Sequence, residues 1–443
     1  HPIPGFAASG PQDEDCLTLN VYTPAADSGR RPVLFWIHGG GFTHGTAGEP
    51  LYDGGRLARR GDVVVVSINY RLGAFGFLHP GLRVEGKGLA ANCGLLDMVA
   101  ALRWVQQNIS FLGGDPRNVT IFGESAGAAA VGTLLAMPDA KGLFQRAILQ
   151  SGTGRALEPS AAAATVDRVA AAAGVEPAGL LTLPGDRLLE AQAKVAAQAA
   201  FGNPVFGPVV DPETLPMQPL EAVRAGAAAG VPVLIGTNRD EVRLFTAMLQ
   251  REEPDGAGLE RAVAALFPGA DADTVREAIG TFRESRRRRG LPAGNLDILD
   301  AISSEGRFRA GALRLAEAQA AHQRGTYVYL FTYASPARRG ALGACHALEL
   351  PFVFGTLDAP TQDRFAGRGP GVQRLSEQMM DAWIAFARGG DPSHPGIGRW
   401  EPYDPVRRPT MVFDLESRLE EDPYGEERRA AASLLGAASQ GSG

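Results

Sequence analysis

Short runs of apolar, often β-branched residues alternate along the chain with longer stretches whose composition favours helices. Several of the short runs are continuously apolar, which is typical of parallel strands buried on both faces of a sheet. The predicted strands are residues 17–22, 33–37, 63–68, 119–122, 147–150, 233–235, 327–332 and 411–413. This alternation predicts an α/β fold with a mostly parallel central sheet and helices on both faces.

Two helices are predicted between these strands, at residues 95–109 and 126–136. Two longer segments, residues 155–200 and 245–325, are rich in Ala, Arg and Glu and are predicted to be helical excursions from the sheet. Such excursions either cover a substrate pocket or only pack against the core, and the sequence does not separate these roles. Large α/β folds reach 443 residues as one unit, so we expect residues 1–443 to form a single domain.

Composition narrows the classes of function. Hydrophobic residues make up 45% of the chain and charged residues 21%, the net charge is -6, and the sequence pI is near 5.8. No nucleic-acid-binding face is indicated, and the one basic run, residues 286–289, is predicted to be a solvated helix end or loop. No apolar run is long enough for a membrane span, and we expect a soluble protein whose compartment is unknown, with the cytoplasm slightly favoured over secretion.

The cysteines and histidines of the sequence indicate neither a disulfide framework nor a metal site. The three cysteines, Cys16, Cys93 and Cys345, are too few and too scattered for a disulfide framework. The seven histidines show no metal-ligand spacing. We therefore expect neither a metal nor another cofactor. The oligomeric state and the compartment are not encoded in any motif that we find.

The strongest chemical signal is Gly123-Glu124-Ser125-Ala126-Gly127. As a bare pattern it is weak, because 56 glycines make chance matches common. Here, however, it lies between a predicted strand and a predicted helix. A strand–turn–helix elbow exposes the serine hydroxyl at the carboxyl end of the sheet, above a helix N-terminus. Ser125 is therefore the candidate nucleophile.

A serine nucleophile needs a base and donors for the oxyanion that forms. A glycine run, His38-Gly39-Gly40-Gly41, follows the strand at 33–37, and the backbone N–H of Ala126 offers another donor. His346 lies in a loop after the strand at 327–332 and is the candidate base. The acid should precede the base in this fold, and Asp240 and Glu241, at the end of a buried strand, are close rivals.

These residues resemble the type-B carboxylesterase and cholinesterase-like family of α/β-hydrolases. The resemblance covers nearly the whole chain, in the order of the family. The matching stretches are residues 14–21, 38–42, 67–71, 94–97, 113–116, 123–127, 150–153, 236–241 and 346–355.

The resemblance implies that Glu241 is the acid of the triad, since the acid of the family follows an Asp. It implies an oxyanion hole formed by Gly40, Gly41 and Ala126. Ser151, Glu124 and Glu349 would hold the triad in place. The implied reaction is hydrolysis of neutral carboxylic esters by water through an acyl-enzyme, with small-molecule esters as substrates.

Two alternatives share the motifs: an amidase, peptidase or lactonase on the same triad, and a non-catalytic binding protein of the cholinesterase-like type. The chain also departs from the family. The edge strands and Ω-loop that precede the cysteine matching Cys16 are expected to be lacking, which leaves Cys16 without a local disulfide partner. The choline-stacking tryptophan of cholinesterases has no counterpart, and an ungapped count places Phe6 at its position.

Overall fold

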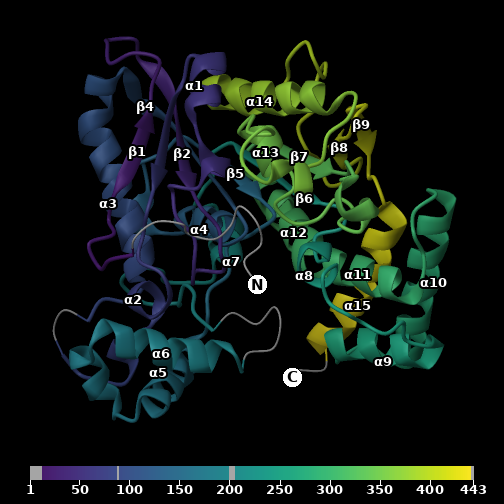
Figure 1. Ribbon diagram of the computed structural model, residues 1–443, viewed down its shortest axis with the longest axis horizontal. Coiled ribbons are helices and arrows are strands. Elements are labelled where there is room, and N and C mark those ends of the chain that lie inside the picture. Colours follow the sequence, from purple (N-terminus) through teal and green to yellow (C-terminus); the bar gives the residue numbers. More distant parts are fainter. Residues whose placement is uncertain (1–11, 87–88, 199–204, 441–443) are drawn as a thin grey trace.

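The computed structural model describes residues 12–86, 89–198 and 205–440 (Figure 1). Within them nine strands form one sheet in the order β1-β3-β2-β4-β5-β6-β7-β8-β9. The strands are β1 (Leu19–Tyr22), β2 (Arg31–Ile37), β3 (Val64–Ile68), β4 (Gly114–Glu124), β5 (Arg146–Gln150), β6 (Val233–Asn238), β7 (Thr326–Phe331), β8 (Pro409–Phe413) and β9 (Arg418–Glu421). Every pairing from β3 to β8 is parallel, and the outer strands β1 and β9 pair antiparallel. The predicted fold class is confirmed.

All eight predicted strands are present, with boundaries that differ by a few residues. The ninth, β9, was missed because its sequence, Arg-Leu-Glu-Glu, is polar and half exposed at the sheet edge. β9 forms because it pairs antiparallel with residues Pro409 to Val412 of β8. A short polar strand of this kind gives no period-2 hydrophobic signal.

The sheet is covered on both faces, as the side chains of β2 show. Val33, Phe35 and Ile37 belong to one apolar core, and Leu34 and Trp36 belong to a second core on the other face. Successive residues of a strand point to opposite faces, so a continuously apolar strand can fill both cores.

The helices are α1 (Gly55–Gly61), α2 (Gly73–Phe77), α3 (Cys93–Asn108), α4 (Ala126–Leu134), α5 (Pro159–Ala173), α6 (Gly185–Ala196), α7 (Pro219–Arg224), α8 (Arg243–Thr246), α9 (Gly256–Leu266), α10 (Ala272–Arg288), α11 (Asn295–Ser304), α12 (Ala310–Ala320), α13 (Leu350–Val353), α14 (Val372–Gly389) and α15 (Gly425–Gln440).

The two predicted excursions are helical, and both reach the cavity described below, the first of them through Arg155 at its start. The first contributes α5 and α6, which pack on each other below the sheet in Figure 1. The second contributes α9, α10 and α11, which build a third apolar core with α15 beside the sheet. Residues of this second excursion line the cavity described below, so it forms part of the pocket wall.

The prediction that residues 286–289 are solvated is wrong for Arg286. This side chain is 2% exposed and lies on the buried face of α10, whereas the next three arginines are exposed. Helical periodicity places position 286 one turn beyond buried Phe282, so the face and not the local composition decides its burial. Among the helices of the described residues, none is long and apolar enough to cross a membrane.

Candidate active site

Ser125 occupies a sharp elbow at the carboxyl end of a central strand. β4 ends at Glu124 and α4 begins at Ala126, so Ser125 is the single residue between strand and helix. Its backbone has a φ of 56° and a ψ of -121°, a conformation that L residues rarely adopt. A side chain at Gly127 would place Cβ 2.0 Å from the carbonyl oxygen of Ile37, so glycine allows α4 to approach β2 closely.

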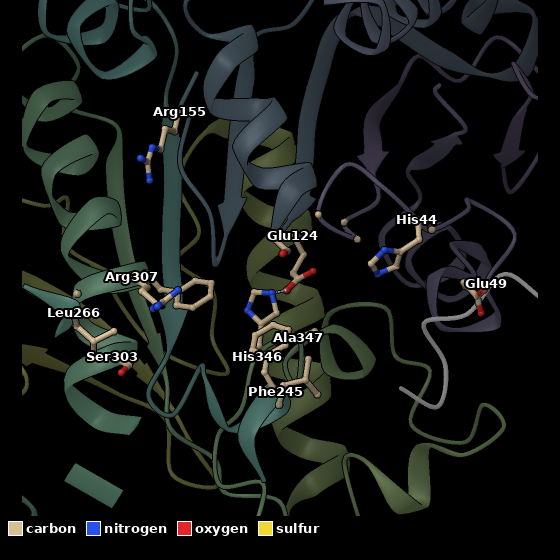
Figure 2. A pocket seen from close by; sticks show the side chains of 18 of the residues that line it. His44, Glu49, Glu124, Arg155, Phe245, Leu266, Ser303, Arg307, His346 and Ala347 are labelled. Carbon is tan, nitrogen blue, oxygen red and sulfur yellow. Dashed lines mark ion pairs between the residues drawn. The ribbon is translucent and has the colours of Figure 1, made fainter. Parts of the chain in front are cut away.

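Ser125 and His346 line one cavity of about 640 Å³, within the usual range for small-molecule sites (Figure 2). The glycine turn after β2 forms one part of its wall. The second helical excursion forms another, through Phe267, Ser303 and Phe308. Segments far apart in the sequence therefore meet around the serine.

A buried hydrogen bond joins His346 to Glu241. The His346 Nδ1 atom lies 2.6 Å from Glu241 Oε2, and the two side chains are 5% and 0% exposed. The other carboxylate oxygen of Glu241 accepts the backbone N–H of Asn238 at 2.8 Å. The backbone N–H of His346 donates to the carbonyl oxygen of Glu241 at 3.1 Å. Two contacts thus fix the end of β6 against the loop that carries the histidine.

Asp240 points away from His346 into a separate ionic cluster. Its Oδ2 atom accepts from Arg239 at 2.8 Å and from the backbone N–H of Ala344 at 3.0 Å. Buried Arg286 donates to its Oδ1 atom at 3.4 Å. Burial would raise the pKa of Asp240, but the neighbouring arginines outweigh burial and hold this pKa well below its ordinary value. Of the two rival carboxylates, only Glu241 contacts the imidazole.

Glu124 faces the other nitrogen of the imidazole. Its Oε1 atom lies 3.0 Å from His346 Nε2 (dashed in Figure 2). Within the described residues no hydrogen bond joins Ser125 to His346, although both line the cavity. Burial lowers the pKa of His346, but Glu124 and Glu241 more than offset burial and hold this pKa well above its ordinary value. Burial in turn raises the pKa of Glu124.

Glu349 is a third buried carboxyl near the histidine. It accepts hydrogen bonds from Asn238 Nδ2 at 2.6 Å and from Gln150 Nε2 at 3.1 Å. Burial, together with Glu124 and Glu241, raises the pKa of Glu349 to about 8. Glu349 is therefore mostly protonated at neutral pH, which limits the repulsion among the three carboxyl groups.

Ser151, the third residue expected to hold the triad, behaves differently. It is 1% exposed and its backbone N–H donates to Gly236, but its hydroxyl has no hydrogen-bond partner among the described residues. The structure thus supplies no side-chain contact through which Ser151 would orient the histidine.

Three backbone N–H groups are available beside the serine. Gly40 and Gly41 have φ values of 104° and 62°, and a Cβ on Gly40 would lie 2.0 Å from the carbonyl oxygen of His44. The N–H groups of Gly40, Gly41 and Ala126 donate to no acceptor in the described part of the chain. Free donors beside a nucleophile are the arrangement that a developing oxyanion requires.

Two aromatic side chains that the sequence did not indicate flank the imidazole. The ring centres of Phe245 and Phe308 lie 5.4 and 5.0 Å from that of His346. Phe308 belongs to a π-helical turn, Glu305–Arg309, a feature often found at functional sites. No motif marks either residue, because each belongs to a helical segment too short to show a hydrophobic periodicity.

The remaining sequence candidates are accounted for as follows. Cys345 is buried, and its carbonyl oxygen accepts from Asn238 Nδ2 at 2.7 Å. Cys16, Cys93 and Cys345 are all free thiols. Within residues 12–86, 89–198 and 205–440, no three His, Cys, Asp or Glu side chains gather as a metal site. Phe6 lies outside the described residues.

Comparisons with known proteins show which family the chain resembles. The model of the carboxylesterase family matches residues 2–431. The para-nitrobenzyl esterase of Bacillus subtilis is 40% identical over 94% of this chain and 83% of that protein. The phenmedipham hydrolase of Pseudarthrobacter oxydans is 36% identical over 90% of this chain and 78% of that protein. The crystal structure of a Geobacillus stearothermophilus carboxylesterase superposes with a TM-score of 0.84 at 42% identity, covering 97% of this chain and 88% of that chain.

Proposed function

The chain belongs to the carboxylesterase family and is a carboxylic ester hydrolase, and from this premise we propose that Ser125, His346 and Glu241 carry out the reaction. The observation that carries this assignment is the buried hydrogen bond of 2.6 Å between Glu241 and His346, in the cavity that Ser125 lines. A carboxylate on Nδ1 keeps the ring proton on that nitrogen, so Nε2 is the nitrogen that accepts the proton of the nucleophile.

The proposed acylation step begins when Ser125 Oγ attacks the ester carbonyl carbon while His346 Nε2 removes its proton. The carbonyl oxygen becomes an oxyanion, which the N–H groups of Gly40, Gly41 and Ala126 stabilise. Collapse of this intermediate breaks the bond to the alkoxy oxygen, which takes the proton from His346 and leaves as the alcohol. Water, deprotonated by His346, then attacks the acyl-enzyme and releases the carboxylic acid.

Glu124 has a specific part in this proposal. In the free enzyme a carboxylate oxygen of Glu124 lies 3.0 Å from Nε2, so Nε2 must turn from Glu124 to Ser125 before the proton can move. Catalytic hydrogen bonds are often long in free enzymes and tighten when substrate binds. Glu124 also stabilises the imidazolium that forms during acylation, because it places a second carboxylate beside the ring.

The test is a burst experiment with p-nitrophenyl butyrate, a small neutral aryl ester. We expect one equivalent of p-nitrophenol per enzyme before steady-state turnover, and covalent labelling of Ser125 by a fluorophosphonate. Ser125→Ala should abolish both, with a loss in kcat of about 10⁶-fold, the value for loss of a triad nucleophile. Ser303→Ala, another serine of the same cavity, is the matched control and should remain within tenfold of the parent.

The same assay separates the ester hydrolase from an amidase. The matched substrate is butyryl p-nitroanilide, which differs only in the atom that leaves. We expect the ester to be turned over far faster than the anilide. A Ser125→Ala variant with kcat within tenfold of the parent, in a preparation free of other esterases, would contradict the assignment of the nucleophile.

A further inference from the structure

The cavity around Ser125 has an uneven distribution of charge. Arg155 and Arg307 line it on one side of His346, whereas His44 and Glu49 line it on the other (Figure 2). We call the first pair the cationic side and Glu49 the acidic side. An ester that occupies a cavity of about 640 Å³ would reach one of these sides when its carbonyl is at Ser125.

The backbone beside Arg155 is anchored, whereas its side chain has no counter-ion among the described residues. Its exposed side chain forms no ion pair or hydrogen bond with the described residues. The next residue, Ala156, is fixed through both backbone groups, which bond to the side-chain amide of Gln218 at 3.2 and 3.0 Å. The loop therefore presents the guanidinium at the cavity wall from an anchored backbone.

Arg307 lies on the π-helical turn, between residues that are fixed on the opposite side. Glu305 and Arg309 are buried and pair with each other at 3.3 Å, away from the cavity. The side chain next to Arg307 is Phe308, whose ring lies 5.0 Å from that of His346. Arg307 therefore belongs to the wall nearest the base.

The acidic side would repel an anion. Glu49 is 6% exposed, and its Oε1 atom has no hydrogen-bond partner among the described residues. Because the two sides have opposite charge, a substrate with a charged tail would bind in one orientation and not the other. Guanidinium groups also match the planar oxygens of carboxylates and phosphoryl groups, with which they form paired hydrogen bonds.

We propose that Arg155 and Arg307 form a subsite for an anionic group, a carboxylate or a phosphoryl group, carried by the ester at a distance from its scissile carbonyl. This inference rests on the proposed function, since the subsite is placed by the reacting serine. It replaces the expectation of neutral esters by esters with an anionic tail, which the enzyme should prefer over matched neutral ones.

The test compares three p-nitrophenyl esters of equal chain length: the adipate hemiester, its methyl ester, and the matching ω-phosphonate. The measured quantity is the ratio of kcat/KM for each anionic ester to that for the neutral methyl ester, after subtraction of the uncatalysed rate. In the parent enzyme we expect this ratio to exceed one for at least one of the two anions. The anion with the higher ratio identifies the preferred group.

Arg155→Gln and Arg307→Gln should each lower this ratio by about tenfold. This corresponds to the weak end of the range for hydrogen bonds to charged groups, because both side chains are exposed. Arg187→Gln removes the same charge from an exposed position on α6, outside the cavity, and should keep the ratio of the parent. Raising the NaCl concentration should also lower the ratio in the parent, because salt screens exposed charges.

Two results would overturn the subsite. One is a ratio at or below one for both anions in the parent; the other is a ratio that stays unchanged in both glutamine variants. Either leaves the proposed function intact, because the neutral ester is still hydrolysed. Failure of the proposed function would look different, since Ser125→Ala would then hydrolyse the neutral ester with a kcat within tenfold of the parent.

Discussion

Asp240 and Glu241 are adjacent buried carboxylates with different partners, so replacing each by its amide should separate catalysis from stability. In Glu241→Gln the side chain keeps its size, and its amide oxygen can still accept the N–H of Asn238, now 2.8 Å from Oε1. The amide nitrogen would then face His346 Nδ1 across a contact of 2.6 Å and donate to it. The ring proton moves to Nε2, which can no longer accept a proton from Ser125.

The expected loss follows from this change of tautomer. An acid-to-amide substitution in a comparable triad lowers kcat by about 10⁴, or about 5.5 kcal/mol at 1.36 kcal/mol per tenfold. The free energy of unfolding should change little, because no buried charge is left without a partner on the imidazole side. The assay is kcat for p-nitrophenyl butyrate, measured together with thermal unfolding.

Asp240→Asn should show the opposite pattern. Arg286 is 2% exposed, and the carboxylate of Asp240 supplies its buried counter-charge. Breaking a buried ion pair on one side costs about 3–5 kcal/mol of stability, which lowers Tm by several degrees in a large domain. A larger loss of kcat in folded Asp240→Asn than in Glu241→Gln would refute the assignment of the acid. So would a Glu241→Gln variant within tenfold of the parent.

Three further predictions follow from the site. Glu124 and Glu241 raise the pKa of His346 despite its burial, and only the neutral imidazole is a base, so kcat/KM should fall on the acid side at a pH above the ordinary histidine pKa of about 6.5. Glu124→Gln should move this acid limb of the pH profile to lower pH. A limb at or below pH 6.5 in the parent would contradict the assigned cause. Gly40→Ala should lower kcat by about 10²–10³-fold, because the added Cβ would clash with the carbonyl oxygen of His44 and displace an oxyanion donor. An unchanged kcat in the folded variant would exclude the N–H of Gly40 from the reaction. Butyrylthiocholine should have a kcat/KM about thirtyfold below that of an uncharged thioester with the same acyl group and leaving-group acidity. The reason is that no tryptophan matches the one that stacks on choline in cholinesterases. Equal or better turnover of butyrylthiocholine would reveal another cation site.

The sequence by itself determined the architecture and the local element around Ser125. Continuously apolar runs, such as residues 33–37 of β2 and 233–235 of β6, favour burial on both faces, and this pattern predicts a covered parallel sheet without knowledge of any contact. The Ser125 elbow was equally readable, because its strand, turn and helix are consecutive in the chain. Likewise, the run Gly39-Gly40-Gly41 is local, and glycine at positions 40 and 41 permits the positive φ that both residues adopt.

The tertiary structure decided which side chains meet across long separations in sequence. Glu241 and His346 are 105 residues apart, and Asp240 and Arg286 are 46 apart, so local pattern could not tell which of the adjacent carboxylates reaches the base. Parallel pairing of β6 with β7 brings the ends of both strands to one edge of the sheet, and the backbone there turns Glu241 toward His346 and Asp240 toward Arg286. The flanking rings of Phe245 and Phe308, the contact of Glu124 with Nε2, and the two arginines of the cavity wall arise in the same way. Each depends on how distant elements pack, and packing has no signature in a single stretch of sequence.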